Sequence, residues 1–305
     1  MRFVQRNAAY SEQSSMFLRR QFLECIAQTS EIPQGFEVAS AKACHLFDTK
    51  GNAYLDLSSG FGVNNLGHGV KEVLEAINQQ TSSYLHSTVY GEHVQGPQVK
   101  LAELLVQILP PSLHSIYFLN SGSEAIDAAL KLARLATGRI ELVVCRKAYH
   151  GSTLGAESLR SDEQHKAPFL PLLPGIRFID FGCMDHLSSI THQTAGVLTE
   201  IVQAEAGVRK ADSTWWSALA DKCRQTNSLL IADEVQTGMG RTGSLFAFMQ
   251  TPIIPDILVS GKALGAGMPL SAVIASGPLM KHFSKRLPLG QLTTFGGHPV
   301  SCAAA

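Results

Sequence analysis

The feature that most constrains the fold of this chain is a series of short apolar segments separated by stretches with helical periodicity. Seven such segments read as strands: "SIYFL" (115–119), "ELVVC" (141–145), "IRFIDF" (176–181), "AGVLTE" (195–200), "SLLIAD" (228–233), "DILVS" (256–260) and "AVIAS" (272–276). Most are apolar throughout, which is typical of strands covered on both faces of a sheet. Strands that alternate with helices predict an α/β protein with a mainly parallel sheet.

Composition excludes several classes of function. The 305 residues include 25 basic and 25 acidic side chains, with no basic stripe, so no nucleic-acid partner is expected. The six cysteines are scattered and form no C-x-x-C pair, which predicts reduced thiols in a cytoplasmic protein, with neither a metal site nor a disulfide framework. The longest stretch with few charges, 257–280, contains Lys262, several glycines and two prolines, so no membrane span is expected.

The N-terminal part has a different pattern. A helix is predicted over roughly residues 14–28. The segment "CHLFDTKGNAYLDL" (44–57) then reads as two short strands around a turn at 48–52, which suits a small N-terminal subdomain.

In parallel α/β sheets, ligands bind outside the carboxyl ends of the strands, so the residue after each strand is a candidate for the site. After "SIYFL", Ser121 and Glu124 have the spacing of a capping box, and Gly138 fits a helix stop. The turn through Gly122 would leave free N–H groups at a helix N-terminus, which suits a phosphate. An ordinary strand-to-helix turn has the same pattern, so this signal is weak alone.

Two further strand ends carry polar or aromatic candidates. Tyr149 and His150 follow "ELVVC", where an aromatic side chain would cover a flat ring or pack in the core. Asp233 ends "SLLIAD", where a buried carboxylate would face a cationic ligand nitrogen, cap a helix or pair with Arg241.

Lys262 is the one charged residue in the twenty-four residues 257–280. A buried ammonium without a partner is costly, whereas a desolvated lysine has a lowered pKa and can act as a neutral nucleophile. Lys262 does not fit a P-loop, because Asp256 and Ala263 stand where that motif needs Gly and Ser or Thr. A phosphate turn, an aromatic ring, an acid and a lone lysine at the strand ends of one sheet form the set that pyridoxal 5′-phosphate (PLP) requires.

The motifs "GFGVNNLGH", "NSGSEA", "AYHG", "ADEVQTGMGRTG", "SGKALGAGMP" and "TTFGGHP" follow in this order. In these motifs the chain resembles the class III PLP-dependent aminotransferases, the family of acetylornithine, ornithine and 4-aminobutyrate aminotransferases. The resemblance implies fold type I, with a seven-stranded sheet sandwiched by helices. It also implies a small domain built from both termini, whose C-terminal part is missing here, so a truncated chain is expected. Residues 1–60 would belong to that domain and 61–305 to the large PLP-binding domain.

The resemblance also assigns roles. Lys262 would bind the cofactor covalently, and Asp233 would keep its ring nitrogen protonated. Val235 and Tyr149 would flank the ring, and Gln236 would reach its phenolic oxygen. The remaining positions implied for the cofactor are Ser121, Gly122 and Ser123 at the phosphate, His150, and Thr294 from the neighbouring subunit of a homodimer with shared active sites. Glu205 and Phe61 would face the substrate, and no metal is expected.

The expected reaction transfers an amino group from an amine or amino acid to a 2-oxo acid, 2-oxoglutarate or pyruvate, by a ping-pong mechanism. Two alternatives stay open: a non-transaminating PLP enzyme, such as an aminomutase or racemase, and an inactive truncated pseudoenzyme that binds PLP. One departure bears on the substrate. Relatives carry arginine after "HG" to grip a carboxylate, whereas Ser152 stands there, so acetylornithine specificity is not expected to transfer.

Overall fold

The computed structural model describes residues 12–89, 92–286 and 288–305. The chain divides into two compact units between Lys71 and Glu72. Among the described residues, no helix is both long enough and apolar enough to cross a bilayer. The predicted division of roles at residues 60 and 61 stays a prediction.

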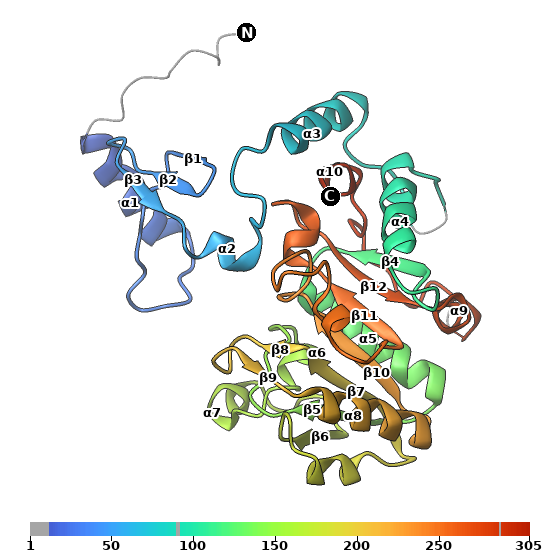
Figure 1. Cartoon of the computed structure of the whole chain (residues 1–305). Coiled ribbons are helices and arrows are strands. Elements are labelled where there is room, and N and C mark those ends of the chain that lie inside the picture. Colours follow the sequence, from blue (N-terminus) through green and yellow to red (C-terminus); the bar gives the residue numbers. More distant parts are fainter. Residues whose placement is uncertain (1–11, 90–91, 287) are drawn as a thin grey trace. The chain divides into compact units, whose positions relative to one another are not determined.

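The first unit contains a helix and a small antiparallel sheet (Figure 1). Its elements are α1 (Glu12–Cys25), β1 (Ser40–Lys42), β2 (His45–Phe47), β3 (Ala53–Leu55) and α2 (Ser59–Gly62). The predicted hairpin is present as β2 and β3, because the Asp48 carboxylate accepts hydrogen bonds from the backbone N–H groups of Lys50 and Asn52 and closes the turn. Two details of the prediction were wrong: α1 ends at Cys25 instead of near Gln28, and β1 adds a third strand.

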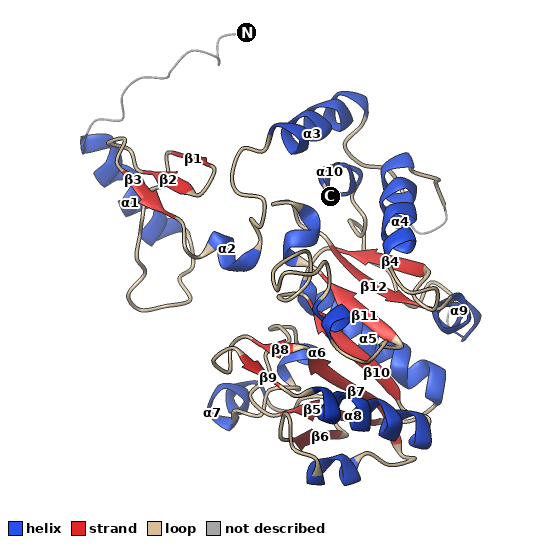
Figure 2. Ribbon diagram, in the orientation of Figure 1, coloured by secondary structure: helices blue, strands red, loops and turns tan. Residues whose placement is uncertain are grey.

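The second unit is built on a seven-stranded sheet (Figure 2). Its strands are β4 (Ser115–Leu119), β5 (Glu141–Cys145), β6 (Ile176–Ile179), β7 (Thr194–Glu200), β10 (Leu229–Glu234), β11 (Ile257–Ser260) and β12 (Ser271–Ala275). The spatial order is β4-β12-β11-β10-β7-β5-β6. Within this sheet β12 is antiparallel to both neighbours, and the other adjacent pairs are parallel. All seven predicted strands are confirmed, with ends shifted by one or two residues.

Helices cover both faces of the sheet, as the wholly apolar strands predict. The second unit contains α3 (Lys71–Ser83), α4 (Gly96–Ile108), α5 (Gly122–Thr137), α6 (Leu154–Glu157), α7 (Glu163–Lys166), α8 (Ser213–Thr226), α9 (Gly277–Arg286) and α10 (Pro299–Ala304). In β5, Val143 belongs to the core beneath α8, whereas Leu142 and Val144 belong to the core beneath α5. All three side chains are fully buried. A short ladder of β8 (Val202–Gln203) and β9 (Arg209–Lys210) follows β7.

The turn from β4 into α5 is the rigid corner that the sequence predicts. Ser121 Oγ accepts a hydrogen bond from the Glu124 N–H at 3.2 Å, and the Glu124 carboxylate accepts one from the Ser121 N–H at 3.1 Å. Gly138 ends the helix with a φ of 71°, a left-handed conformation that glycine adopts readily. The capping box fixes where the first N–H groups of α5 point, and this corner becomes one wall of the site.

Candidate active site

A pocket of about 170 Å³ opens at the carboxyl ends of the parallel strands. It is lined by Gly122, Ser123, Tyr149, His150, Gly151, Glu200, Val202, Ala204, Glu205, Asp233, Val235, Gln236, Thr237 and Lys262. These residues come from the start of α5 and from the segments at the ends of β5, β7, β10 and β11. The pocket therefore lies where the rule for parallel α/β sheets predicts a ligand site.

Asp233 and His150 form a buried pair at the base of the pocket. Oδ2 of Asp233 lies 2.6 Å from Nδ1 of His150, and its Oδ1 accepts a hydrogen bond from the Val235 N–H at 2.9 Å. Burial lowers the pKa of His150, but the hydrogen bond to the Asp233 carboxylate and its charge outweigh that effect, so the net shift is upward. The pair therefore offers a carboxylate whose position is fixed by an imidazole and a backbone amide.

Lys262 enters the pocket directly after β11. Its backbone is left-handed, with a φ of 46°, and its Nζ donates a hydrogen bond to Oε1 of Gln236. Burial lowers the pKa of Lys262, while the charges of Asp233 and Glu205 oppose that shift without reversing it. The direction agrees with the sequence-based expectation of a lysine that gives up its proton more readily than an exposed one.

Two glycines let the walls of the pocket approach each other. A Cβ on Gly122 would lie 2.8 Å from Cγ1 of Val235, and a Cβ on Gly151 would overlap Oγ of Ser123. Gly151 also has a φ of +125°, which an L side chain rarely adopts. The close approach brings the first N–H groups of α5, those of Gly122 and Ser123, to the pocket wall. N–H groups at a helix start have no acceptor within the helix and favour an anion.

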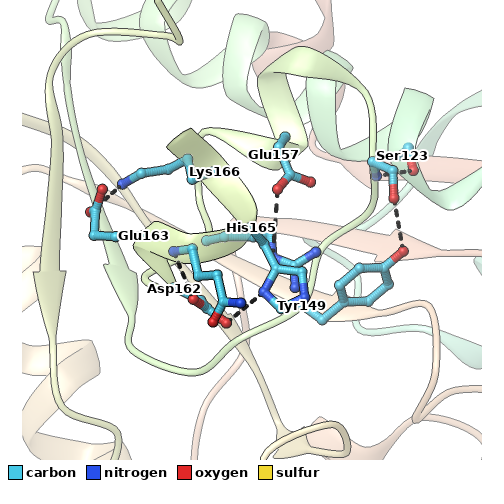
Figure 3. Close-up of polar contacts among 10 residues, drawn as sticks. Ser123, Tyr149, Glu157, Asp162, Glu163, His165 and Lys166 are labelled. Carbon is cyan, nitrogen blue, oxygen red and sulfur yellow. Dashed lines mark hydrogen bonds and ion pairs between the residues drawn. The ribbon is translucent and has the colours of Figure 1, made fainter. Parts of the chain in front are cut away.

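Tyr149 presents a supported aromatic ring to the pocket. Its hydroxyl lies 3.1 Å from Oγ of Ser152, and the Ser152 N–H donates to Ser123 Oγ at 3.2 Å, which ties this loop to α5. The guanidinium of Arg160 lies 5.8 Å from the centre of the Tyr149 ring and 3.6 Å from the Glu157 carboxylate. Figure 3 shows the Glu157 contact and the contact of the Tyr149 hydroxyl. Tyr149 is 39% exposed, so it is not the packed core tyrosine of the alternative interpretation.

The donor set fits pyridoxal 5′-phosphate. A desolvated lysine can bind an aldehyde, a buried carboxylate can face a ring nitrogen, an aromatic ring can stack, and a helix N-terminus can hold a phosphate. Within the described parts of the chain, Nε2 of His150 and Oε2 of Glu200 are also buried without a hydrogen-bond partner. Unsatisfied polar atoms in a pocket wall are typical of a site that binds a polar ligand.

Three of the predicted site residues lie outside this pocket wall. Ser121 caps α5, and its carbonyl accepts a hydrogen bond from Ser271 Oγ at 2.7 Å. Thr294 is exposed in the segment between α9 and α10, and Phe61 belongs to the first unit. Their predicted contacts stay predictions.

The sequence analysis missed Glu200 as a site residue. Glu200 ends a predicted apolar strand, as Asp233 does, so the same rule about strand ends would have found it.

Comparison with known proteins agrees with the geometry. The family model for class-III aminotransferases matches residues 26–305. The chain is 37% identical over 273 residues to the [LysW]-aminoadipate semialdehyde/glutamate semialdehyde transaminase of Sulfolobus acidocaldarius, covering 89% of this chain and 69% of the relative. It is 39% identical over 276 residues to the acetylornithine aminotransferase of Methanocaldococcus jannaschii, covering 88% and 67%.

Solved structures show the same fold. The ornithine aminotransferase of Toxoplasma gondii superposes with a TM-score of 0.86 at 27% identity, over 95% of this chain and 69% of that one. The taurine:2-oxoglutarate aminotransferase of Bifidobacterium kashiwanohense, solved with PLP and glutamate, gives a TM-score of 0.86 at 26% identity, over 95% and 71%. The chain belongs to the class-III aminotransferases and is a PLP-dependent transaminase of fold type I.

Proposed function

We propose that the pocket at the carboxyl ends of β5, β7, β10 and β11 moves an amino group from an amine or amino acid to a 2-oxo acid, 2-oxoglutarate or pyruvate, by a ping-pong mechanism. The observation that carries this proposal is the convergence of Lys262, Asp233 and Gln236 in one pocket whose rim is a helix N-terminus. Each group supports a different part of the reaction.

Bound PLP supplies an electron sink for the electron pair left when the donor loses its α-proton. Lys262 Nζ would anchor the cofactor and then, as a free amine, accept and return that proton. A base must be unprotonated to do so, and the lowered pKa of Lys262 increases its neutral fraction near pH 7. Gln236, which accepts a hydrogen bond from Nζ, would orient the lysine and reach the phenolic oxygen of the cofactor.

The other walls would hold the cofactor in place. The Asp233 carboxylate, fixed by His150 and the Val235 N–H, would accept a hydrogen bond from the ring nitrogen and favour its protonated form. Val235 and Tyr149 would flank the ring. The N–H groups of Gly122 and Ser123, ordered by the Ser121 cap, would bind the phosphate.

A half-reaction distinguishes transamination from the alternatives. With PLP bound and no acceptor present, a donor should release one equivalent of its oxo product per site, and a 2-oxo acid should then regenerate the starting form. A racemase or aminomutase would convert the donor without a stoichiometric oxo product, and a pseudoenzyme would release none. Either result would overturn the proposed reaction.

Substrate preference should follow from Ser152. Its hydroxyl is held beside Tyr149, where it cannot form the bidentate contact that arginine makes with a carboxylate. We therefore expect donors other than acetylornithine and 4-aminobutyrate to have the highest kcat/KM. Ser152→Arg should raise kcat/KM for acetylornithine. Ser158→Arg is not a suitable control for this variant, because Ser158 is buried. If acetylornithine is the best donor of the unmodified chain by a wide margin, the inference fails.

The proposed assembly is a homodimer with shared active sites. Helix α4 exposes the apolar side chains Val99, Leu104, Val106 and Ile108. Nε2 of Gln98 on the same helix donates to the Gly297 carbonyl at 2.6 Å, which ties α4 to the segment that carries Thr294. An apolar surface next to an exposed residue predicted to bind phosphate supports an isologous contact in which Thr294 serves the partner's site.

Mixing two inactive chains tests that arrangement. Lys262→Ala cannot anchor the cofactor, and Thr294→Asp should repel its phosphate. If Thr294 acts across the interface, a mixed dimer has one site with both residues intact, and activity returns on mixing. If Thr294 acts within its own chain, each site keeps one lesion. No recovery, with the mixed dimer confirmed by mass spectrometry, would refute the shared site.

The cytoplasm is the proposed compartment. All six cysteines are free thiols, and three of them, Cys145, Cys223 and Cys302, are buried. Burial raises the pKa of each of these three to about 12, so they resist oxidation and suit a reducing compartment. Fractionation of cells with an antibody against the chain would test this location.

A further inference from the structure

Glu200 is a buried acid in the pocket wall to which the proposed reaction assigns no role. It ends β7, and in the parallel ladder it lies directly opposite Asp233 of β10. Opposed residues of neighbouring parallel strands direct their side chains to the same face. The two carboxylates therefore enter the pocket side by side, Glu200 being 5% and Asp233 4% exposed.

His150 interacts with the charges of both carboxylates. Its Nδ1 bonds Asp233 at 2.6 Å, while its Nε2 has no hydrogen-bond partner among the described residues. Oε2 of Glu200, in the same wall, likewise has none in that part of the chain. Burial raises the pKa of Glu200 to about 7, although the charge of His150 opposes that shift, and the charge of Glu200 in turn contributes to the raised pKa of His150. No hydrogen bond joins Nε2 of His150 to Glu200, so Glu200 acts on the imidazole through its charge, as a second buried carboxylate in the same pocket wall.

The other charged groups around Glu200 do not replace His150 as its counter-charge. The titratable groups of the pocket wall are Tyr149 and His150 after β5, Asp233 on β10, Glu205 after β8 and Lys262 after β11. Asp233 repels the Glu200 charge, while the Tyr149 and Ala204 N–H groups favour it. Lys262 would be engaged by the cofactor, which leaves His150 as the cation that interacts with Glu200. Above about pH 7, where Glu200 is ionised, these three groups carry one net negative charge when Asp233 is ionised and His150 is protonated, which matches one protonated ring nitrogen at Asp233.

We propose that Glu200 is a positioning residue that acts through His150: it holds the imidazole doubly protonated, and the imidazole holds Asp233 ionised and oriented toward a cationic ring nitrogen. This inference rests on the proposed function for the identity of the ring. Glu200 itself is not proposed to touch the substrate. Its effect reaches the cofactor through the Nδ1–Oδ2 hydrogen bond.

The direct test is the titration of His150, followed by ¹⁵N NMR of the full chain labelled in histidine, with the signal assigned from a His150→Asn variant. Glu200→Gln removes the charge but keeps the shape, so the midpoint of His150 should fall by about one pH unit. Glu200→Asp keeps the charge and should restore most of that shift. Asp256→Asn, which neutralises an exposed carboxylate at the opposite end of the sheet, should leave the midpoint unchanged.

A second measurement needs no variant, so it still decides the matter if Glu200→Gln does not fold. In the unmodified chain, the Glu200 carboxyl carbon and the His150 nitrogens should show shared inflections, as coupled groups do. Independent single-step titrations, or a His150 midpoint that is the same in folded Glu200→Gln, would overturn the inference.

Cofactor binding provides a further readout that separates this inference from the proposed function. Glu200→Gln should weaken the affinity for PLP roughly tenfold at pH 8, whereas Asp256→Asn should not. If borohydride fixes PLP to Lys262 but Glu200→Gln changes neither affinity nor the His150 titration, the inference is wrong and the proposed function stands. If no PLP is fixed to Lys262, the proposed function is wrong, and the titration still decides whether Glu200 and His150 are coupled.

Discussion

The two ends of the seven-stranded sheet differ in how far their polar groups are satisfied by hydrogen bonds. At the amino ends of the strands, Nη1 of Arg139 donates to the carbonyls of Thr194, Thr226 and Asn227 at 2.9, 3.0 and 2.9 Å. There Asp256 also accepts a hydrogen bond from the Leu230 N–H at 2.8 Å. Each of these side chains forms hydrogen bonds with backbone groups, and these bonds stabilise the start of the strands.

At the carboxyl ends of the strands, several polar atoms are left without a hydrogen-bond partner among the described residues. Oε2 of Glu200, Nε2 of His150 and Oγ of Ser260 are buried without a hydrogen-bond partner in the described residues. Native proteins satisfy the great majority of their buried polar atoms, so a cluster of exceptions needs a cause. The contrast teaches that one end of this sheet serves stability alone, whereas the other retains unsatisfied groups for a ligand.

The same contrast separates two consecutive residues of β10. Asp233 faces the pocket, while Glu234, which faces the other way, is fully buried and accepts hydrogen bonds from Thr237 Oγ1 and from the N–H groups of Ala247 and Phe248. Successive residues of a strand point to opposite faces, so neighbouring acids have different partners. Glu234 holds the loop that follows β10 in place, and that loop carries Gln236.

The largest expected effect comes from removing the amine at the carboxyl end. Lys262→Ala should lower transaminase turnover by about ten-thousandfold, because both the covalent anchor and the base are lost. Lys281→Ala, which changes an exposed lysine of α9, is the matched control and should keep full turnover. Turnover with a saturating donor and acceptor measures both, and a Lys262→Ala enzyme within tenfold of the unmodified chain would contradict the assignment.

Asp233→Asn and Asp256→Asn compare the two ends with the same chemical change. Asp233→Asn should still bind PLP but lose about a thousandfold in turnover, because an amide does not stabilise a protonated ring nitrogen as a carboxylate does. Asp256→Asn should keep its turnover and change stability by less than about 1 kcal/mol, because Asp256 is exposed and the amide oxygen of asparagine can still accept the hydrogen bond from the Leu230 N–H. Equal losses of turnover in the two variants would remove the distinction between the ends.

Glu200→Gln should increase stability, and the gain should depend on pH. Burial raises the pKa of Glu200 to about 7 from an ordinary value near 4.5. As the pH rises through this window, the unfolded chain loses the proton while the folded chain retains it, so the unmodified protein loses stability. Glutamine does not titrate, so its advantage should be absent below pH 4.5 and reach up to about 3 kcal/mol above pH 7. Urea unfolding at pH 5 and pH 8 measures it, and a pH-independent difference would contradict the account.

Arg139→Met should have the opposite sign to Glu200→Gln and a smaller size. The change removes the guanidinium donor from the carbonyls of Thr226 and Asn227, while the Thr194 carbonyl keeps a hydrogen bond from Ser228 Oγ, and the loss should cost about 2 kcal/mol. Turnover measured well below the melting temperature should not change, because Arg139 lies at the end of the sheet away from the pocket. Urea unfolding and the transaminase assay check the two halves of this prediction separately.

Local signals in the sequence were sufficient for much of this fold. The seven strands are apolar and short, and Ser121, Glu124 and Gly138 stand at the spacing of helix caps, so neighbouring residues alone define them. The antiparallel direction of β12 was not predicted, although segment 261–270 is shorter than the roughly dozen residues that a parallel crossover needs. A signal for it was therefore present.

Many residues of the pocket wall could be named from the sequence, but their pairings could not. The bond between His150 and Asp233 joins positions 83 residues apart, and only the register of the folded sheet brings Glu200 opposite Asp233. The sequence analysis offered Arg241 as a partner for Asp233 because it is near in sequence, whereas the structure pairs Asp233 with His150. Long-range pairings depend on strand order, which local patterns do not contain.

The most direct test of the central claim is to trap the cofactor on the chain. After the protein is mixed with PLP, borohydride reduction should fix a pyridoxyl group to one lysine, and peptide mapping should place it on Lys262 at the carboxyl end of the sheet. The lowered pKa of this lysine favours its reaction with the aldehyde. A label confined to Lys281 or Lys285 of α9, or spread evenly over exposed lysines, would contradict the claim that this pocket is the transaminase site.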